Sequence, residues 1–223
     1  MWFSSCLRES KLSSLDQHTA AYLDGFRLRS FVFKPTTRLL ETRGGIVVLW
    51  NDDYITLNDC VTGEFHLSAD IEVRECLTKF RLSVIYGPTR YRARQRFLEE
   101  LKGIKPENNT RWLLLGDFNL ICKATDKNNR KLNLSLMRQF HKALNECELQ
   151  EIHLQNRKFT WSNERRQTKL MKLDRFLCNA EWDSAFPSHV LHALSTSLSD
   201  HAPLLLSSQS GPRRPRTFRF ENF

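Results

Sequence analysis

Short apolar segments typical of buried β-strands recur along this chain and limit it to folds built around a sheet. Residues 44–50 (Gly-Gly-Ile-Val-Val-Leu-Trp) form a continuous, largely β-branched run after a glycine pair, which predicts a buried strand. Residues 65–73 alternate apolar and polar side chains, the period of a half-buried strand. Residues 80–86 repeat that alternation and stop at Gly87-Pro88, because proline cannot continue a central strand. The other apolar runs predicted to be strands are residues 112–115 and 201–206.

Two segments with helical periodicity lie between these strands. Residues 90–101 carry apolar side chains at helical spacing among arginines, and residues 134–149 carry them along one line. Strands mixed with helices, without an internal repeat, predict one α/β unit. We expect this domain to span residues 1–208. Residues 209–223 contain Ser-Gly-Pro-Arg-Arg-Pro-Arg and are predicted to be a basic linker that leaves the domain.

The composition is that of an ordinary globular protein with an excess of positive charge. The chain has 223 residues, a net charge of +9 and 40% hydrophobic residues, enough to bury a substantial core. A basic balance favours a polyanionic partner, usually nucleic acid, which is bound through phosphate contacts and counterion release. The alternative is simply a basic surface that keeps the protein soluble. Charge alone does not decide between the two.

Cysteine spacing and the absence of long apolar runs indicate an intracellular protein. The six cysteines are scattered without a C-x-x-C pair, which argues against a zinc cluster and a dense disulfide framework. We expect most of them to be small buried side chains. No apolar run reaches the length of a membrane span, and the first residues lack the basic region of a signal peptide.

Polar side chains follow the apolar run at residues 112–115. Asp117 comes where this strand should end, and Asn119, two residues later, points to the same side if the extension continues. Phosphodiester hydrolysis requires an activated water and stabilisation of charge on the phosphoryl oxygens. Asp117 can serve that chemistry, with the Asn119 amide orienting it or binding phosphate. The alternative is an Asx turn that closes the strand.

A second polar pair, Asp200-His201, lies between apolar segments. The carboxylate can bind a metal ion, while the imidazole meets the phosphate or the attacking water. A catalytic histidine needs a partner that fixes its tautomer, and Asp174 is the candidate. The structural alternatives are an ion pair of Asp174 with Arg175 or Lys172, and an ordinary core histidine at His201.

Two further candidates carry weaker signals. Glu9 precedes Ser-Lys-Leu and has a structural alternative as a first-turn glutamate that complements a helix dipole. Tyr86 ends its predicted strand, and its alternative is a core side chain.

In this order and spacing, seven segments resemble the endonuclease/exonuclease/phosphatase superfamily, and in particular the apurinic-like endonuclease domain of plant non-LTR (LINE-type) retrotransposons. The segments are Arg-Glu-Ser-Lys-Leu-Ser-Ser (8–14), Arg-Gly-Gly-Ile-Val-Val-Leu-Trp (43–50), Val-Ile-Tyr-Gly-Pro (84–88), Leu-Gly-Asp-Phe-Asn (115–119), Phe-Thr-Trp-Ser-Asn (159–163), Leu-Asp-Arg-Phe (173–176) and Ser-Asp-His-Ala-Pro-Leu (199–204). The tail, Phe-Arg-Phe-Glu-Asn (218–222), is similar to the segment that leads to a reverse transcriptase in such elements.

The resemblance implies a four-layered α/β sandwich, two mixed β-sheets flanked by helices, with the site at one end. It implies roles for eight positions, in which Glu9 and Asp200 bind the metal ion, Asp117 activates the water beside Asn119, Asp174 orients His201, Tyr86 contacts the phosphate or the leaving oxygen, and Trp161 lies near the bound nucleotide. Core packing is the alternative for Trp161. The implied cofactor is Mg²⁺, with Mn²⁺ as a substitute.

Two departures from the family pattern concern the start of the chain. Relatives begin with a strand that carries a metal-binding Asn, and this strand is expected to be missing here; the Gln before the metal-binding glutamate is replaced by Arg8. Loss of an interior strand would leave unpaired backbone groups in one sheet. We therefore expect an N-terminally incomplete domain, a fragment of an element or a chain begun at an internal methionine.

Three functions follow, from different classes. The first is a Mg²⁺-dependent DNA endonuclease that nicks one strand and leaves a 3′-OH for a reverse transcriptase, which in a full-length relative is part of the same chain. The second is a degenerate domain that binds nucleic acid without cutting it, through basic segments such as residues 90–96 and 213–219. The third, a small-molecule phosphatase, is disfavoured by the closer likeness to retroelements. We expect a monomer that acts on DNA, with the nucleus as the compartment that suits this substrate.

Overall fold

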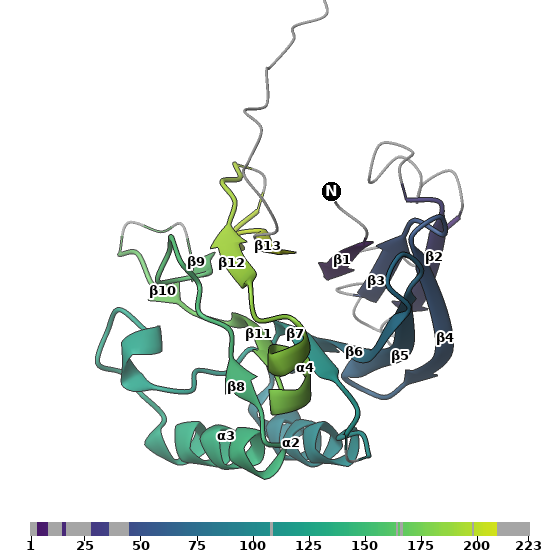
Figure 1. The fold of residues 1–223 in the computed structure, drawn as a ribbon. Coiled ribbons are helices and arrows are strands. Elements are labelled where there is room, and N and C mark those ends of the chain that lie inside the picture. Colours follow the sequence, from purple (N-terminus) through teal and green to yellow (C-terminus); the bar gives the residue numbers. More distant parts are fainter. Residues whose placement is uncertain are drawn as a thin grey trace, which may run out of the picture.

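A computed structural model describes residues 4–8, 15–16, 28–35, 45–107, 109–163, 165, 167–197 and 199–208 of the chain. Figure 1 shows strands and helices that assemble into layers around a central sheet. The strands are β1 (Ser4–Arg8), β2 (Ser30–Pro35), β3 (Gly45–Trp50), β4 (Ile55–Thr62), β5 (His66–Val73), β6 (Thr78–Tyr86), β7 (Trp112–Asp117), β8 (Gln150–Glu151), β9 (Trp161–Ser162), β10 (Leu170–Met171), β11 (Asp174–Cys178), β12 (His189–Ala193) and β13 (Leu204–Ser208). The helices are α2 (Arg94–Gly103), α3 (Leu134–Glu146) and α4 (Ala180–Ala185), with 3₁₀ turns η1 (Tyr91–Ala93) and η2 (Ala124–Asp126).

The central sheet has six strands in the order β4-β5-β6-β7-β11-β8. Strands β4, β5 and β6 form an antiparallel meander, and β7 then lies parallel to β6. A parallel neighbour requires a crossover connection, which α2 provides. Strand β11 returns antiparallel to β7, although 56 residues lie between the end of β7 and the start of β11. The sheet is therefore mixed, as predicted.

Strand β7 shows why its sequence is apolar throughout. Its residues alternate between two cores: Leu113 and Leu115 belong to one, and Trp112 and Leu114 belong to the other with α2 and α3. A strand covered on both faces has no polar side to present. Figure 1 shows α2 and α3 together below the sheet.

A second layer of strands covers the other face of the central sheet. It consists of the three-stranded sheet β1-β3-β2 and the pair β12-β13. Ile46 and Val48 of β3, with Leu191 and Ala193 of β12, share one core with the central strands. The predicted α/β sandwich is thus confirmed. Among the described residues β1 pairs only with β3, and β13 only with β12. The expectation that an interior strand is missing stays a prediction.

Most predicted elements form near their predicted residues, and two begin later. The helix expected from residue 90 starts at Arg94, because Tyr91–Ala93 adopts a tighter 3₁₀ turn. The last strand starts at Leu204 rather than at residue 201, because His201 makes only an isolated bridge and Pro203 follows.

The expectation that most cysteines are buried is wrong for the described residues. Cys147 and Cys178 are buried and Cys122 is half-buried, whereas Cys60 and Cys76 are exposed. In the described part of the chain, no helix has the length and apolar character needed to cross a bilayer.

Glu100 of α2 fixes the turn that leads into β5. Its carboxylate accepts hydrogen bonds from the backbone N–H of Glu64 (3.0 Å) and of Phe65 (2.7 Å), and lies 2.7 Å from Nδ1 of the buried His66. Burial disfavours the charged carboxylate, but the His66 ring and the backbone donors outweigh this effect. The pKa of Glu100 therefore lies below its ordinary value.

Replacing Glu100 by Gln is expected to lower the free energy of unfolding by about 1–2 kcal/mol at pH 7, since hydrogen bonds to a charged acceptor are lost. A depressed pKa means that this contribution is present above the unfolded-state value near 4.5 and disappears as the pH falls through the lower native value. Urea unfolding at pH 7 and pH 3.5 should show the variant approaching wild type in acid. Glu99→Gln, on the same helix but exposed, is the control. An equal deficit at both pH values would contradict the assignment.

Candidate active site at the ends of three strands

Three neighbouring strands place three predicted site residues in one row. Tyr86 is the last residue of β6 and lies beside Asp117, the last residue of β7. Asp117 in turn lies opposite Asp174, the first residue of β11. Parallel pairing of β6 with β7 and antiparallel pairing of β7 with β11 bring these residues to a common sheet edge. The spacing of Tyr86, Asp117 and Asp174 along the sequence does not by itself show that they lie side by side.

The row lies at the end of the core between the two strand layers. Because side chains alternate along a strand, Asp117 faces the same side as Leu115, and Tyr86 the same side as Val84, both in that core. Asp117 is 2% exposed and Asp174 is 1% exposed. Carboxylates so deeply buried require hydrogen-bonding partners, and their surroundings supply them.

Glycine at position 116 allows the close approach of β7 to β6. Gly116 has φ +150°, and a Cβ there would lie 2.1 Å from the carbonyl oxygen of Ile85. Only glycine fits this conformation and this distance. The Leu-Gly-Asp segment therefore sets the place of Asp117 through the backbone of the residue before it.

Asn119 orients Asp117, but not by continuing the strand. Strand β7 ends at Asp117, and Asn119 has a left-handed φ of +50°, so the expected extension is wrong. Its backbone N–H donates to Asp117 Oδ1 and its Nδ2 to Asp117 Oδ2, both at 2.9 Å. Nδ2 also lies 2.9 Å from the carbonyl of Gly87. The two alternatives offered by the sequence, an Asx turn at Asp117 and an Asn119 side chain that orients Asp117, are therefore both present in one arrangement.

His201 and Asp174 form the expected pair. Nδ1 of His201 lies 2.8 Å from Oδ2 of Asp174. An ionised carboxylate only accepts, so Nδ1 carries the proton and Nε2 is directed elsewhere. The alternative ion pair of Asp174 with Arg175 does not form, because alternation along β11 turns Arg175 to the opposite face. There its guanidinium binds Asp126 (2.6 Å) and Glu151 (2.7 Å).

Asp200 is exposed, and Trp161 holds its side chain. The indole N–H of Trp161 donates to Asp200 Oδ2 at 2.8 Å, and the backbone N–H of Ser162 donates to the Asp200 carbonyl at 3.0 Å. Trp161 also bridges His201 through the backbone. The family resemblance implies a place near the nucleotide for Trp161, with core packing as the alternative; the structure shows a direct contact with Asp200, a predicted metal ligand.

Thr160 contacts the site and was missed by the sequence analysis. It is 2% exposed, and its hydroxyl accepts from the backbone N–H groups of Leu173 and Asp174, both at 3.0 Å. Its position inside the Phe-Thr-Trp-Ser-Asn segment could have marked Thr160 as a site residue. The sequence does not show, however, which backbone groups bond to a threonine hydroxyl.

The donor set suits a hard cation. Glu9, the other predicted ligand, lies outside the described residues, and among those described no three His, Cys, Asp or Glu side chains converge on one point. Mg²⁺ typically uses only one or two protein carboxylates and completes its shell with water and phosphate oxygens. Asp200, exposed and fixed in orientation, fits that requirement.

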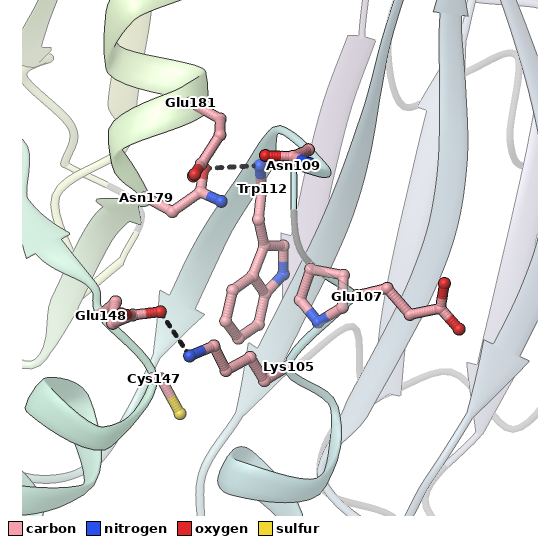
Figure 2. Close-up of a pocket in the computed structure, with 9 residues that line it drawn as sticks. Lys105, Glu107, Asn109, Trp112, Cys147, Glu148, Asn179 and Glu181 are labelled. Atoms are coloured by element: carbon pink, nitrogen blue, oxygen red, sulfur yellow. Dashed lines mark hydrogen bonds and ion pairs between the residues drawn. The ribbon is translucent and has the colours of Figure 1, made fainter.

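A small pocket lies at the opposite end of β7 (Figure 2). Figure 2 shows the Lys105–Glu148 ion pair and the start of β7 at Trp112 beside Cys147. Burial raises the pKa of the Cys147 thiol to about 11, so this thiol is protonated and unreactive at neutral pH. None of the predicted site residues lines this pocket.

Comparison with known proteins supports the sandwich fold. A model of the endonuclease/exonuclease/phosphatase family matches residues 7–201. None of the curated proteins matches the chain.

Several solved structures share the fold. The endonuclease domain of TRAS1, a telomere-specific non-LTR retrotransposon, has a TM-score of 0.60 at 14% identity, over 84% of each chain. The catalytic domain of Xenopus laevis APE2 has a TM-score of 0.64 at 16% identity, over 95% of this chain and 86% of that one. D. rerio TDP2 complexed with a single-strand DNA product has a TM-score of 0.54 at 14% identity, over 90% of this chain and 83% of that one.

Proposed function

The chain belongs to the endonuclease/exonuclease/phosphatase family, and on that premise we propose that it is a Mg²⁺-dependent DNA endonuclease derived from a non-LTR retrotransposon. The observation that carries this proposal is the row of Tyr86, Asp117 and Asp174 at one sheet edge, completed by His201 on Asp174. A carboxylate and an imidazole held in fixed orientations can accept and donate protons, as acid–base catalysis requires.

Each side chain in the row has a distinct task. Asp117, held by two N–H groups of Asn119, takes a proton from the attacking water. The water oxygen bonds to phosphorus as the bond from phosphorus to the 3′ oxygen breaks, and that oxygen takes a proton from a solvent water and leaves as a 3′-OH. His201, fixed by Asp174, contacts the phosphoryl oxygens with its outer nitrogen and donates to them when the ring carries a second proton, and Tyr86 contacts the phosphate or the leaving oxygen.

Glu9 and Asp200 would hold the metal ion. When bound, Mg²⁺ supplies positive charge that stabilises the phosphoryl oxygens. Tyr86, Asp117 and His201 remain responsible for orientation and proton movement.

Charge supports DNA as the substrate. The segment that follows Gly87 carries Tyr91 (70% exposed) and the exposed Arg92, and it starts at the carbonyl that Asn119 contacts. Exposed arginines bind phosphates and exposed aromatic rings stack on bases. The described relatives include a retrotransposon endonuclease domain and a protein bound to a DNA product. A nuclear location and action as a monomer suit this substrate and belong to the proposal.

Nicking of supercoiled plasmid by the purified chain tests the function. We expect relaxed circles with Mg²⁺ and none with EDTA, because the charge on phosphate is then uncompensated. DNA polymerase should extend the nick directly, since the product carries a 3′-OH. Undiminished cutting in EDTA, or nicks that need end repair before extension, would refute the proposed reaction.

Binding without cleavage is the alternative outcome. Folded protein that does not nick but retains the plasmid with an affinity of roughly 10⁻⁴–10⁻⁶ M, weakening as salt is raised, would identify a nucleic-acid-binding remnant. The exposed Arg92, in the segment that follows Gly87, favours this second function if the first fails.

A further inference from the structure

We infer that Thr160, directly before the two-residue strand β9, and Trp161, its first residue, position the acidic groups of the site without contacting the substrate. Thr160 sets Asp174, and Trp161 sets Asp200. The inference rests on the proposed function, and it replaces the expected nucleotide contact of Trp161 by a role that acts through another residue.

Thr160 connects the two segments that form the His201–Asp174 pair. Its hydroxyl accepts from the N–H of Leu173 and of Asp174, both at 3.0 Å, at the point where β11 begins. Its carbonyl accepts from the N–H of Ala202 at 2.8 Å, directly after His201. One buried residue therefore fixes the chain on both sides of the 2.8 Å contact between His201 and Asp174.

Trp161 fixes the remaining acid. An indole N–H is a donor only, so its 2.8 Å contact selects one orientation of the Asp200 carboxylate and leaves Oδ1 for other ligands. The backbone bridge from Trp161 to His201 and the bond from Ser162 to the Asp200 carbonyl hold the segment in register.

Strand β9 is too short to maintain this arrangement by itself. It pairs with β10 through two residues only. Short strand pairs are marginally stable without further contacts, so the side-chain bonds of Thr160 and Trp161 hold this strand against the start of β11 and against Asp200.

A matched pair of variants tests Thr160. Thr160→Val keeps the shape but removes the acceptor, and we expect kcat for nicking to fall about 10–100-fold, as for supporting residues of metal sites, with KM for DNA within about twofold. Thr160→Ser keeps the hydroxyl and should restore kcat to within about threefold of wild type. Serine and valine variants of equal activity, or a change confined to KM, would overturn the inference. Thermal unfolding of both variants shows whether each is folded.

Terbium luminescence tests Trp161 independently of activity. Tb³⁺, a hard cation, emits when a nearby indole is excited, and a cation on Asp200 would lie next to Trp161. We expect sensitised emission that is lost in Trp161→Phe and retained in Trp182→Phe, a substitution in α4. Emission unchanged in Trp161→Phe would refute the role of Trp161, even if Thr160→Val does not fold.

These measurements separate the inference from the proposed function. If Tb³⁺ emission in wild type depends on Trp161 but the protein never nicks DNA, a cation site beside Trp161 is supported and the endonuclease proposal fails. If wild type nicks but Thr160→Val is fully active and Trp161→Phe keeps its emission, only the positioning inference fails.

Discussion

Replacing His201 by Ala is expected to lower the rate of Mg²⁺-dependent plasmid nicking by about 10²–10⁴-fold, the usual contribution of one acid–base group. The substitution removes the imidazole that lies 2.8 Å from Asp174 and leaves that carboxylate, 1% exposed, without its histidine. The defect should be in kcat, because phosphate charge and the basic surface still bind DNA. Initial rates of relaxed-circle formation at saturating DNA measure it.

Two further variants identify the cause of the loss. Asp174→Asn keeps the shape but presents an amide to Nδ1, so the preferred tautomer is lost and activity should also fall strongly. His153→Ala changes an exposed histidine outside the site and should leave the rate unchanged. If His201→Ala kept more than about a hundredth of wild-type activity, the threshold set by the lower end of this range, His201 would not be the catalytic imidazole.

Replacing Arg175 by Met is expected to lower the free energy of unfolding by about 3–5 kcal/mol, the cost of breaking a buried ion pair by removing one partner. Arg175 is 1% exposed and binds Asp126 and Glu151, and Asp126 is itself 2% exposed. Burial opposes the charge of Arg175, but the two carboxylates outweigh it and raise the pKa of the guanidinium. Urea unfolding at pH 7 measures the loss.

A double variant and a surface control sharpen this test. Arg130→Met removes an exposed arginine and should change stability by less than about 0.5 kcal/mol. Adding Asp126→Asn to Arg175→Met removes the stranded negative charge and should recover part of the loss. If Arg175→Met lay within about 1 kcal/mol of wild type, its ion pairs would only balance their desolvation.

The sequence predicted individual strands well because each is a local pattern. The β-branched run of β3 and the alternation of β5 and β6 are explained by which faces they bury. The side of the sheet to which Arg175 turns also follows from alternation, and it removes the ion pair with Asp174 that the sequence left open.

The assembly of the site was less accessible, since it depends on long-range pairing. Asp117 and Asp174 become opposite residues only because β11 returns beside β7, and no local pattern fixes that neighbour. The roles of Thr160 and Asn119 depend on bonds made by a hydroxyl and by a left-handed residue. The candidate site residues were predicted from the family resemblance, whereas their arrangement follows from the pairing of β6, β7 and β11.

The opposition of Asp117 and Asp174 has a consequence for how such a gene decays. Like charges directly opposite on adjacent strands oppose pairing, and both carboxylates are almost fully buried. On the proposed function, a copy no longer selected for cutting would lose no selected activity by neutralising either one, and relief of this repulsion would favour the change. Asn at position 117 or 174 would therefore identify copies that have lost the proposed activity but still fold.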